Sequence, residues 1–394
     1  MISPYVPFPG IDHAGGAYLE AHLRASAQER EIDLFAPDSP ENRRGAAEHG
    51  TTARIHLVPV PPPPKTSLGR RAWNVRNVLR GLTPGWQVLR AFRSSEPLRA
   101  AVEGADLIEV HWNYMLPVLD GLGHGQRPVL VFCHDVVAQV FERRAHVARS
   151  PAKQVLGNLA RRIKRQEVAY LDRTGGALVF SDKDIGLLRS AGLKVPAHVL
   201  DPLVQIPPEP ATLCGRALLF AAAMHRPENV DGISWFLETA WPQVLERVTD
   251  AELVIAGSNP PPGLGVGVPG VTVTGYVADF DELYLAARGA VIPLRAGAGL
   301  KFKVVQALLW GLPVITTPIG AEGIVDRSGD DVFASISTDP QVLADACVRV
   351  LTEDDLAHAL GDAARAWALE RYDAQRGLQK ALELGQQLVS AASP

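Results

Sequence analysis

The second half of the chain alternates short apolar runs with segments of helical periodicity. The apolar runs have strand length and predict strands at residues 216–223, 251–257, 271–277, 289–294, 313–317 and 331–336. Helical patterns lie between them at 229–245, 281–288, 301–310 and 340–351. This regular alternation predicts a parallel sheet covered by helices on both faces. In such sheets ligands bind beside the carboxyl ends of the strands.

The first half has a less regular pattern of the same kind. Predicted strands lie at 31–37, 53–60, 106–112, 128–135 and 176–182, and a helix is expected to begin near Ala17. Residues 58–64 predict a stiff polyproline spacer, and the proline-rich segment 201–210 is the expected linker. Two helical segments end the chain, with a break expected at Tyr372–Asp373. The fold class is therefore predicted to be α/β.

Length and charge favour two domains. The chain has 394 residues, which exceeds the usual size of one hydrophobic core. Its net charge of −4 hides an asymmetry, because residues 1–202 hold 26 Lys and Arg against 20 Asp and Glu. The rest of the chain is acidic, so the halves are expected to have different partners.

Composition excludes several classes of protein. No run of 18 apolar residues predicts a membrane span, and the N-terminus lacks a signal-peptide pattern. Cys133, Cys214 and Cys347 are scattered without a CxxC spacing, which favours reduced thiols and a cytoplasmic location. The sequence shows no zinc-ligand spacing and no Asp-x-Asp pair after a suitable strand, so we expect no metal and no cofactor.

The segment GAVIPLRAGAGLKFKVVQALLWGLPVITT (289–317) carries the strongest chemical signal. It predicts a strand, a glycine-rich turn, a helix and a second strand. Gly297 and Gly299 expose backbone N–H groups at the positive end of the helix, beside Lys301 and Lys303. Such a turn predicts a site for an anion such as a nucleotide phosphate. The alternative is an ordinary corner with two solvated lysines.

Several motifs, in this order, resemble the GT-B glycosyltransferases, and most of all the retaining enzymes called glycosyltransferase family 4. They are MHRPENVDGISWF, AELVIAGS, VTVTGYVAD, the glycine-turn segment with TPIGAEGI, and WALERYD, with thinner support from PFPGIDHAGGAYLEAHL and VLVFCHDV. The resemblance implies two Rossmann-like domains facing a cleft. It places an acceptor domain at 1–202 with a returning helix at 373–394, and a domain for a nucleotide-diphospho-sugar donor at 203–372.

The resemblance also implies roles for single residues. His134 would contact the donor sugar, and Arg226 and Lys303 would offset charge on the leaving diphosphate without a metal ion. The other implied donor contacts are Gly15, Gly16, Asn229, Gly257, Tyr276, Val277, Gly297, Ala298, Gly299, Leu300, Lys301, Gln306 and Glu322. Candidates on the acceptor side are His13, His111 and Asp135. Each has a structural alternative, such as a tight turn, a strand end or a helix cap.

Two positions depart from the family pattern. Family members commonly carry two glutamates eight positions apart across the glycine turn, and this chain has Ala298 and Gln306 there. Gln306 keeps a hydrogen-bond acceptor for the ribose hydroxyls but lacks the charge.

Residues 65–93 hold seven basic residues and no acidic ones, with Trp73, Trp86 and Phe92 interleaved. This pattern indicates a surface for membrane or an acidic partner, or else a solvated helical hairpin. No nucleic-acid-binding motif accompanies it.

Together these features predict a retaining, hexosyltransferase-like glycosyltransferase acting on a saccharide, lipid-linked or small-molecule acceptor, cytoplasmic or peripheral at the inner membrane face. The alternatives are a non-catalytic GT-B subunit that binds a glycan or partner, and a nucleotide-sugar epimerase.

Overall fold

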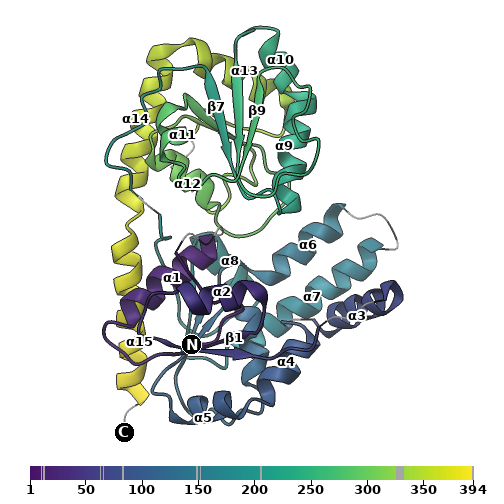
Figure 1. Ribbon diagram of the computed structural model, residues 1–394, viewed down its shortest axis with the longest axis vertical. Coiled ribbons are helices and arrows are strands. Elements are labelled where there is room, and N and C mark those ends of the chain that lie inside the picture. The colour runs from purple at the N-terminus through teal and green to yellow at the C-terminus, as the bar shows by residue number, and fades with distance from the viewer. Residues whose placement is uncertain are drawn as a thin grey trace. The chain divides into compact units, whose positions relative to one another are not determined.

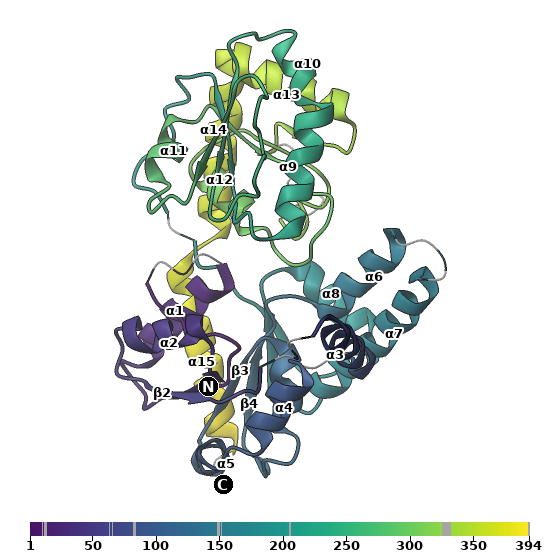
Figure 2. The same ribbon diagram turned by 45° about the vertical axis from the view of Figure 1, so that its right-hand side comes forward.

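A computed structural model of the chain divides into two compact units. Unit 1 comprises residues 1–203 and 375–394, and unit 2 comprises residues 204–374. The structure describes all residues except 10, 12–13, 63, 65, 82–83, 148–149, 151, 205, 325–331 and 393–394. Figures 1 and 2 show the elements of each unit.

Unit 2 is a parallel sheet between two layers of helices. Its strands are β7 (Ala217–Ala221), β8 (Glu252–Ala256), β9 (Val271–Gly275), β10 (Gly289–Ile292), β11 (Val314–Thr316) and β12 (Ser335–Ile336). Its helices are α9 (Pro227–Thr239), α10 (Trp241–Leu245), α11 (Asp281–Ala286), α12 (Phe302–Leu309), α13 (Pro340–Thr352) and α14 (Asp354–Arg371). Helices α9, α10 and α13 bury one face of the sheet, around Phe236, Trp241 and Cys347. Helices α11, α12 and α14 lie on the other side (Figure 1).

The strand order of unit 2 creates a crevice for a ligand. The described strands run β12-β11-β10-β7-β8-β9, and all neighbouring pairs are parallel. After β7 the chain continues to β8 and β9, which lie on one side of β7 in the sheet. It then returns to β10 on the other side of β7 and continues to β11 and β12. Ligands of open parallel sheets bind at such a switch point, beyond the strand carboxyl ends. The loops after β7 and β10 are therefore the expected site.

Unit 1 is likewise built from parallel strands and helices. Its strands are β1 (Asp33–Pro37), β2 (Arg54–Val58), β3 (Ile108–His111), β4 (Val129–Phe132), β5 (Gly176–Val179) and β6 (Ala197–Val199). Its helices are α1 (Ala14–Ser26), α2 (Pro40–Glu48), α3 (Ser67–Arg80), α4 (Trp86–Arg93), α5 (Glu96–Gly104), the 3-10 helix η1 (Asn113–Leu119), α6 (Val137–Val147), α7 (Ala152–Leu171), α8 (Asp182–Ser190) and α15 (Ala374–Ala392).

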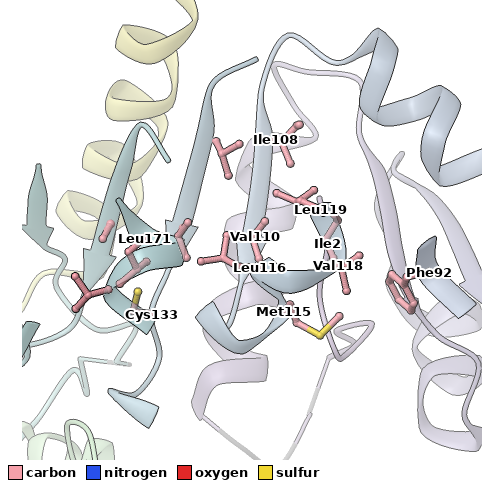
Figure 3. Close-up of a cluster of buried hydrophobic side chains, with 14 of the residues drawn as sticks. Ile2, Phe92, Ile108, Val110, Met115, Leu116, Val118, Leu119, Cys133 and Leu171 are labelled. Atoms are coloured by element: carbon pink, nitrogen blue, oxygen red, sulfur yellow. The ribbon is translucent and has the colours of Figure 1, made fainter. Parts of the chain in front are cut away.

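The N-terminal residues join the two groups of strands in unit 1. Ile2 bridges Phe35 of β1 and Val110 of β3 in parallel fashion, so it lies between β2-β1 and β3-β4-β5-β6. Its side chain is buried with Val110, Leu116 and other apolar residues, as Figure 3 shows. The switch point of this sheet therefore lies beside the end of β3.

Alternation along the strands decides which side chains meet. Ile108 and Val110 of β3 enter the apolar core under η1, so Glu109 and His111 point to the opposite face. On β4 the same alternation places Phe132 and then His134 on the face of Glu109 and His111. This is the face covered by α1, whose Tyr18 packs on Phe132 and Phe180.

The predicted α/β class is confirmed, with local differences. The helix predicted at 229–245 is two helices, because the chain breaks at Ala240 before Pro242. The described part of the strand predicted at 331–336 is only Ser335–Ile336. The short strand β6 has no clear apolar run and was not predicted. Within segment 65–93 the structure describes the helices α3 and α4.

Candidate functional site

The glycine turn after β10 is held by Lys301. Gly297 and Gly299 have φ angles of 129° and 68°, which other residues rarely adopt. The Lys301 ammonium is buried and donates to the carbonyl oxygens of Ala298 at 3.0 Å and Gly299 at 2.6 Å. It also lies 3.9 Å from Oε2 of Glu322, in the loop after β11. Lys301 therefore stabilises the turn and connects it to the loop after β11. The sequence did not reveal this role.

Lys303 reaches from the same turn to the loop after β7. Its Nζ donates to Asn229 Oδ1 at 2.5 Å and lies 5.5 Å from the centre of the Phe220 ring. Asn229 is buried, and its Nδ2 donates to the Ala223 carbonyl at 2.7 Å. Asn229 is thus in the first turn of α9 and links the loop to Lys303, whereas the cap position of α9 is Arg226. This link crosses the switch point between β7 and β10.

The charges at this switch point are positive and close together. Burial, together with repulsion from Arg226 and Lys301, lowers the pKa of Lys303 to about 7. Arg226 itself is exposed at the start of α9. A cation whose pKa is depressed by its neighbours gains most from a bound anion, which restores its charged form. The arrangement is suited to a diphosphate.

Other predicted donor contacts surround this point at the same edge of the sheet. Gly257 follows β8 with a φ of 148°, and a Cβ there would lie 1.8 Å from the Ala222 carbonyl oxygen, so packing alone requires glycine. Tyr276 follows β9 and is 69% exposed, with Val277 half-buried. Leu300 is buried in the glycine turn and Gln306 is half-buried on α12. Their contacts with a donor stay predictions.

In unit 1, the first turn of α1 lies against two aromatic rings. A Cβ on Gly15 would come within 2.7 Å of Trp112 Cζ2 and 3.1 Å of His134 Nδ1. The rings of Trp112 and His134 stack with centroids 3.9 Å apart. Gly15 thus allows the start of α1 to approach His134. The structure brings together Gly15 and His134, while Gly16 follows in α1 and its contact with a donor stays a prediction. The structure also adds Trp112, whose φ of 65° is unusual for a non-glycine residue.

A buried carboxylate holds the segment that carries His134. Glu167 of α7 accepts hydrogen bonds from the backbone N–H groups of Val137 at 2.8 Å and Ala138 at 3.1 Å. It also accepts from Asn113 Nδ2 at 2.6 Å. Burial raises the pKa of Glu167 to about 7, against the opposite effect of these donors. Glu167, which lies on α7, therefore caps the N-terminus of α6. The backbone carbonyl of Asp135 accepts a second hydrogen bond from Asn113 Nδ2, at 3.3 Å.

His111 lies in a buried polar cluster with His22 and Glu109. Its ring stacks on Phe132 at 4.1 Å, and burial followed by the charge of His22 holds its pKa well below the usual value. His22 Nε2 lies 3.0 Å from Glu109 Oε2. Burial opposes ionisation of Glu109, but attraction from His22 and Arg30 keeps its pKa below the usual value.

Among the described residues, His22, Glu109 and His111 have ligand atoms within 4.8 Å of one another, close enough to consider a metal ion. The ion pairs of Glu109 with His22 and Arg30 already compensate its charge, which favours a structural role. The full burial of His111 likewise favours packing over acceptor contact. His13 lies outside the described residues, and Asp135 is half-buried beside His134.

Sequence reasoning missed Glu167 and Trp112. Glu167 had a detectable signal, because it lies four positions after Ile163 and beside Val168, both buried, on an otherwise basic helix. An acidic residue on the apolar face of a helix predicts a buried, hydrogen-bonded carboxylate. For Trp112 the only signal in the sequence was its position at the end of a predicted strand.

Comparisons with known proteins agree with this geometry. Residues 215–353 match the family model described as Glycosyl transferases group 1. The matched segment contains the loops after β7 and β10 and the cations that they bring together. A 44.6 kDa uncharacterized protein in the cps region of Klebsiella pneumoniae is 27% identical over 168 residues, which are 39% of this chain and 42% of that protein. The matched region thus spans less than half of this curated relative.

Solved structures show that the whole chain has the GT-B fold. Sucrose-phosphate synthase from Thermosynechococcus elongatus has a TM-score of 0.72 at 16% identity, covering 99% of both chains. Anabaena HepE in complex with UDP and glucose has a TM-score of 0.64 at 16% identity, again covering 99% of both. WaaG, a glycosyltransferase involved in lipopolysaccharide biosynthesis, has a TM-score of 0.61 at 16% identity and covers 98% of both.

Proposed function

We propose that the protein is a retaining glycosyltransferase that takes a sugar from a nucleotide-diphospho-sugar. The observation that carries the proposal is the Lys303–Asn229 link, with Arg226 beside it, at the switch point of the glycosyl transferase group 1 domain. In the reaction the bond between the anomeric carbon and the diphosphate oxygen breaks, and the diphosphate leaves with the electron pair. An acceptor hydroxyl forms the new bond to that carbon and releases its proton.

The proposed division of labour follows from charge and position. Lys303 and Arg226 neutralise the developing charge on the diphosphate, and the N–H groups of the glycine turn bind its oxygens. These cations stand in for a metal ion, so we propose a reaction without metal or cofactor. Gln306 accepts a hydrogen bond from a ribose hydroxyl, and Tyr276 and Val277 frame the base. His134 contacts the donor sugar.

Incubation of the purified protein with a panel of nucleotide sugars tests this function. HepE was solved in complex with UDP-glucose, so that donor comes first. We expect nucleoside diphosphate release that persists in a chelator, and a product whose anomeric configuration, measured by NMR, matches the donor. Inversion, or activity lost to a chelator and restored by magnesium, would contradict the mechanism. If no nucleoside diphosphate is released, the protein is better described as a binding subunit. If the nucleotide sugar is epimerised, the protein is better described as an epimerase.

We propose that the acceptor is lipid-linked and that α3 touches an anionic membrane surface. Leu68 and Val75 lie one heptad apart on α3 and are 77% and 57% exposed. Arg70 and Arg76 on the same helix are also exposed, and the Arg76 guanidinium lies 4.5 Å from the centre of the Trp86 ring. Exposed apolar and basic side chains on one helix are typical of interfacial binding. No helix among the described residues is long and apolar enough to cross a membrane.

Co-sedimentation with vesicles tests this surface. The protein should bind phosphatidylglycerol vesicles and bind phosphatidylcholine vesicles much less, since the arginines need anionic headgroups. Replacing Leu68 and Val75 by Glu should abolish binding. Val266→Glu is the matched control, because Val266 is 78% exposed but lies in unit 2. Equal binding by the α3 variant and the control would contradict the proposal.

A further inference from the structure

We infer that Glu167 is a positioning residue for His134, and that its carboxylate fixes both segments that orient the imidazole. The inference rests on the proposed function, in which His134 contacts the donor sugar. Glu167 lies outside the motifs that resemble the family, on α7, and meets the segment of His134 only through the fold.

The first of these segments is the connection from β4 to α6. It runs through Cys133, whose N–H donates to the Leu178 carbonyl at 2.7 Å, and then through His134 and Asp135. On its far side the N–H groups of Val137 and Ala138 donate to Glu167. The short stretch that bears His134 is therefore fixed on one side by strand β5 and on the other by Glu167.

The second segment follows β3 and carries the ring that stacks on His134. Asn113 is adjacent to Trp112, and its amide donates to both Glu167 and the Asp135 carbonyl. Trp112 in turn stacks on His134. A single carboxylate thus fixes the backbone after the imidazole and, through Asn113, the aromatic partner of that imidazole.

The contacts require a carboxylate and not an amide. Three N–H groups converge on the Glu167 oxygens, and a carboxylate is the side chain that accepts at both oxygens. A glutamine would turn its NH₂ group toward at least one N–H donor. Glu167→Gln therefore preserves volume while breaking one side of the clamp, so it should loosen the orientation of His134 with little change in packing.

The test is a double-mutant cycle on kcat with the nucleotide sugar that the wild type uses best. Glu167→Gln should lower kcat about 10- to 100-fold, as expected when a reacting contact is misplaced by a fraction of an ångström to one ångström. The donor KM should change little, because the diphosphate contacts lie in unit 2. In a His134→Ala background the same substitution should have almost no further effect on kcat, since Glu167 acts through His134.

Asp172→Asn is the matched control. Asp172 follows the same helix, and its carboxylate accepts from the backbone N–H groups of Lys194 and Val195, which precede β6 and lie away from His134. It should leave kcat near the wild-type value. If Glu167→Gln does not fold, Asn113→Ala takes its place, because it removes the link to Trp112 and should lower kcat in the same non-additive way.

The outcomes separate this inference from the proposed function. A wild type inactive with every donor would overturn the proposed function and, with it, this inference. If the wild type is active and the His134→Ala variant has a normal kcat, His134 does not have the proposed role. If His134→Ala is impaired but Glu167→Gln is normal, or if the two effects simply add, Glu167 does not position His134.

Discussion

Lys303→Ala should lower kcat/KM roughly 100- to 1000-fold, the loss expected for one preorganised charge contact to a developing anion. The Lys303 ammonium is held by Asn229 at the switch point, where we propose that the diphosphate binds, so its removal would leave the diphosphate without its central cation. Arg226→Ala should act in the same direction. Steady-state kinetics with the best nucleotide-sugar donor measure both effects.

Lys303→Met is the matched control for packing, because methionine fills similar space over Phe220 without charge. It should be as impaired as the alanine variant and should fold as the wild type does. If Lys303→Ala and Arg226→Ala both fold and keep near-normal kcat/KM, the diphosphate does not bind at this point.

The same lysine should set the alkaline limb of the pH profile. Its pKa in the free protein is lowered to about 7, so its ammonium fraction falls as pH rises above that value. The wild-type kcat/KM, which reports free-enzyme ionisations, should therefore decrease above neutrality. Lys303→Arg stays charged across this range and should lose the limb, provided that it retains activity.

Gly257→Ala should destabilise unit 2 by about 3 kcal/mol or more. The residue has a φ of 148°, and the added Cβ would lie 1.8 Å from the Ala222 carbonyl oxygen. Since both atoms belong to fixed backbone at the ends of β7 and β8, no side-chain rotation relieves the clash. The measurement is calorimetric unfolding, where the midpoint should fall by roughly 2–4 °C per kcal/mol for a domain of this size.

Gly263→Ala separates the clash from the backbone conformation. Gly263 also has a positive φ, 89°, but a Cβ there would meet nothing within 4 Å. Its substitution should cost only about 1–2 kcal/mol, the usual penalty for a left-handed residue with a Cβ. Equal effects of the two substitutions would show that Ala222 does not restrict Gly257.

The sequence by itself determined the alternating architecture of unit 2 and the glycine turn. Strand length, helical periodicity and glycine punctuation are local signals, so they can be read where they occur. The predicted strands β7, β8, β9, β10 and β11 and the turn around Gly297 and Gly299 follow from them. Local signals are weaker where elements are short, which is why β6 and the break at Ala240 were missed.

Only the tertiary structure decided which polar groups meet. Lys301 and Lys303 are two positions apart and look equivalent in sequence, yet Lys301 turns back onto the glycine turn while Lys303 crosses to Asn229, which is 74 positions away. Glu167 likewise meets the start of α6 from 30 positions away. Spacing along a chain fixes the face on which a side chain lies, whereas its partner depends on how strands order themselves and how helices pack across them.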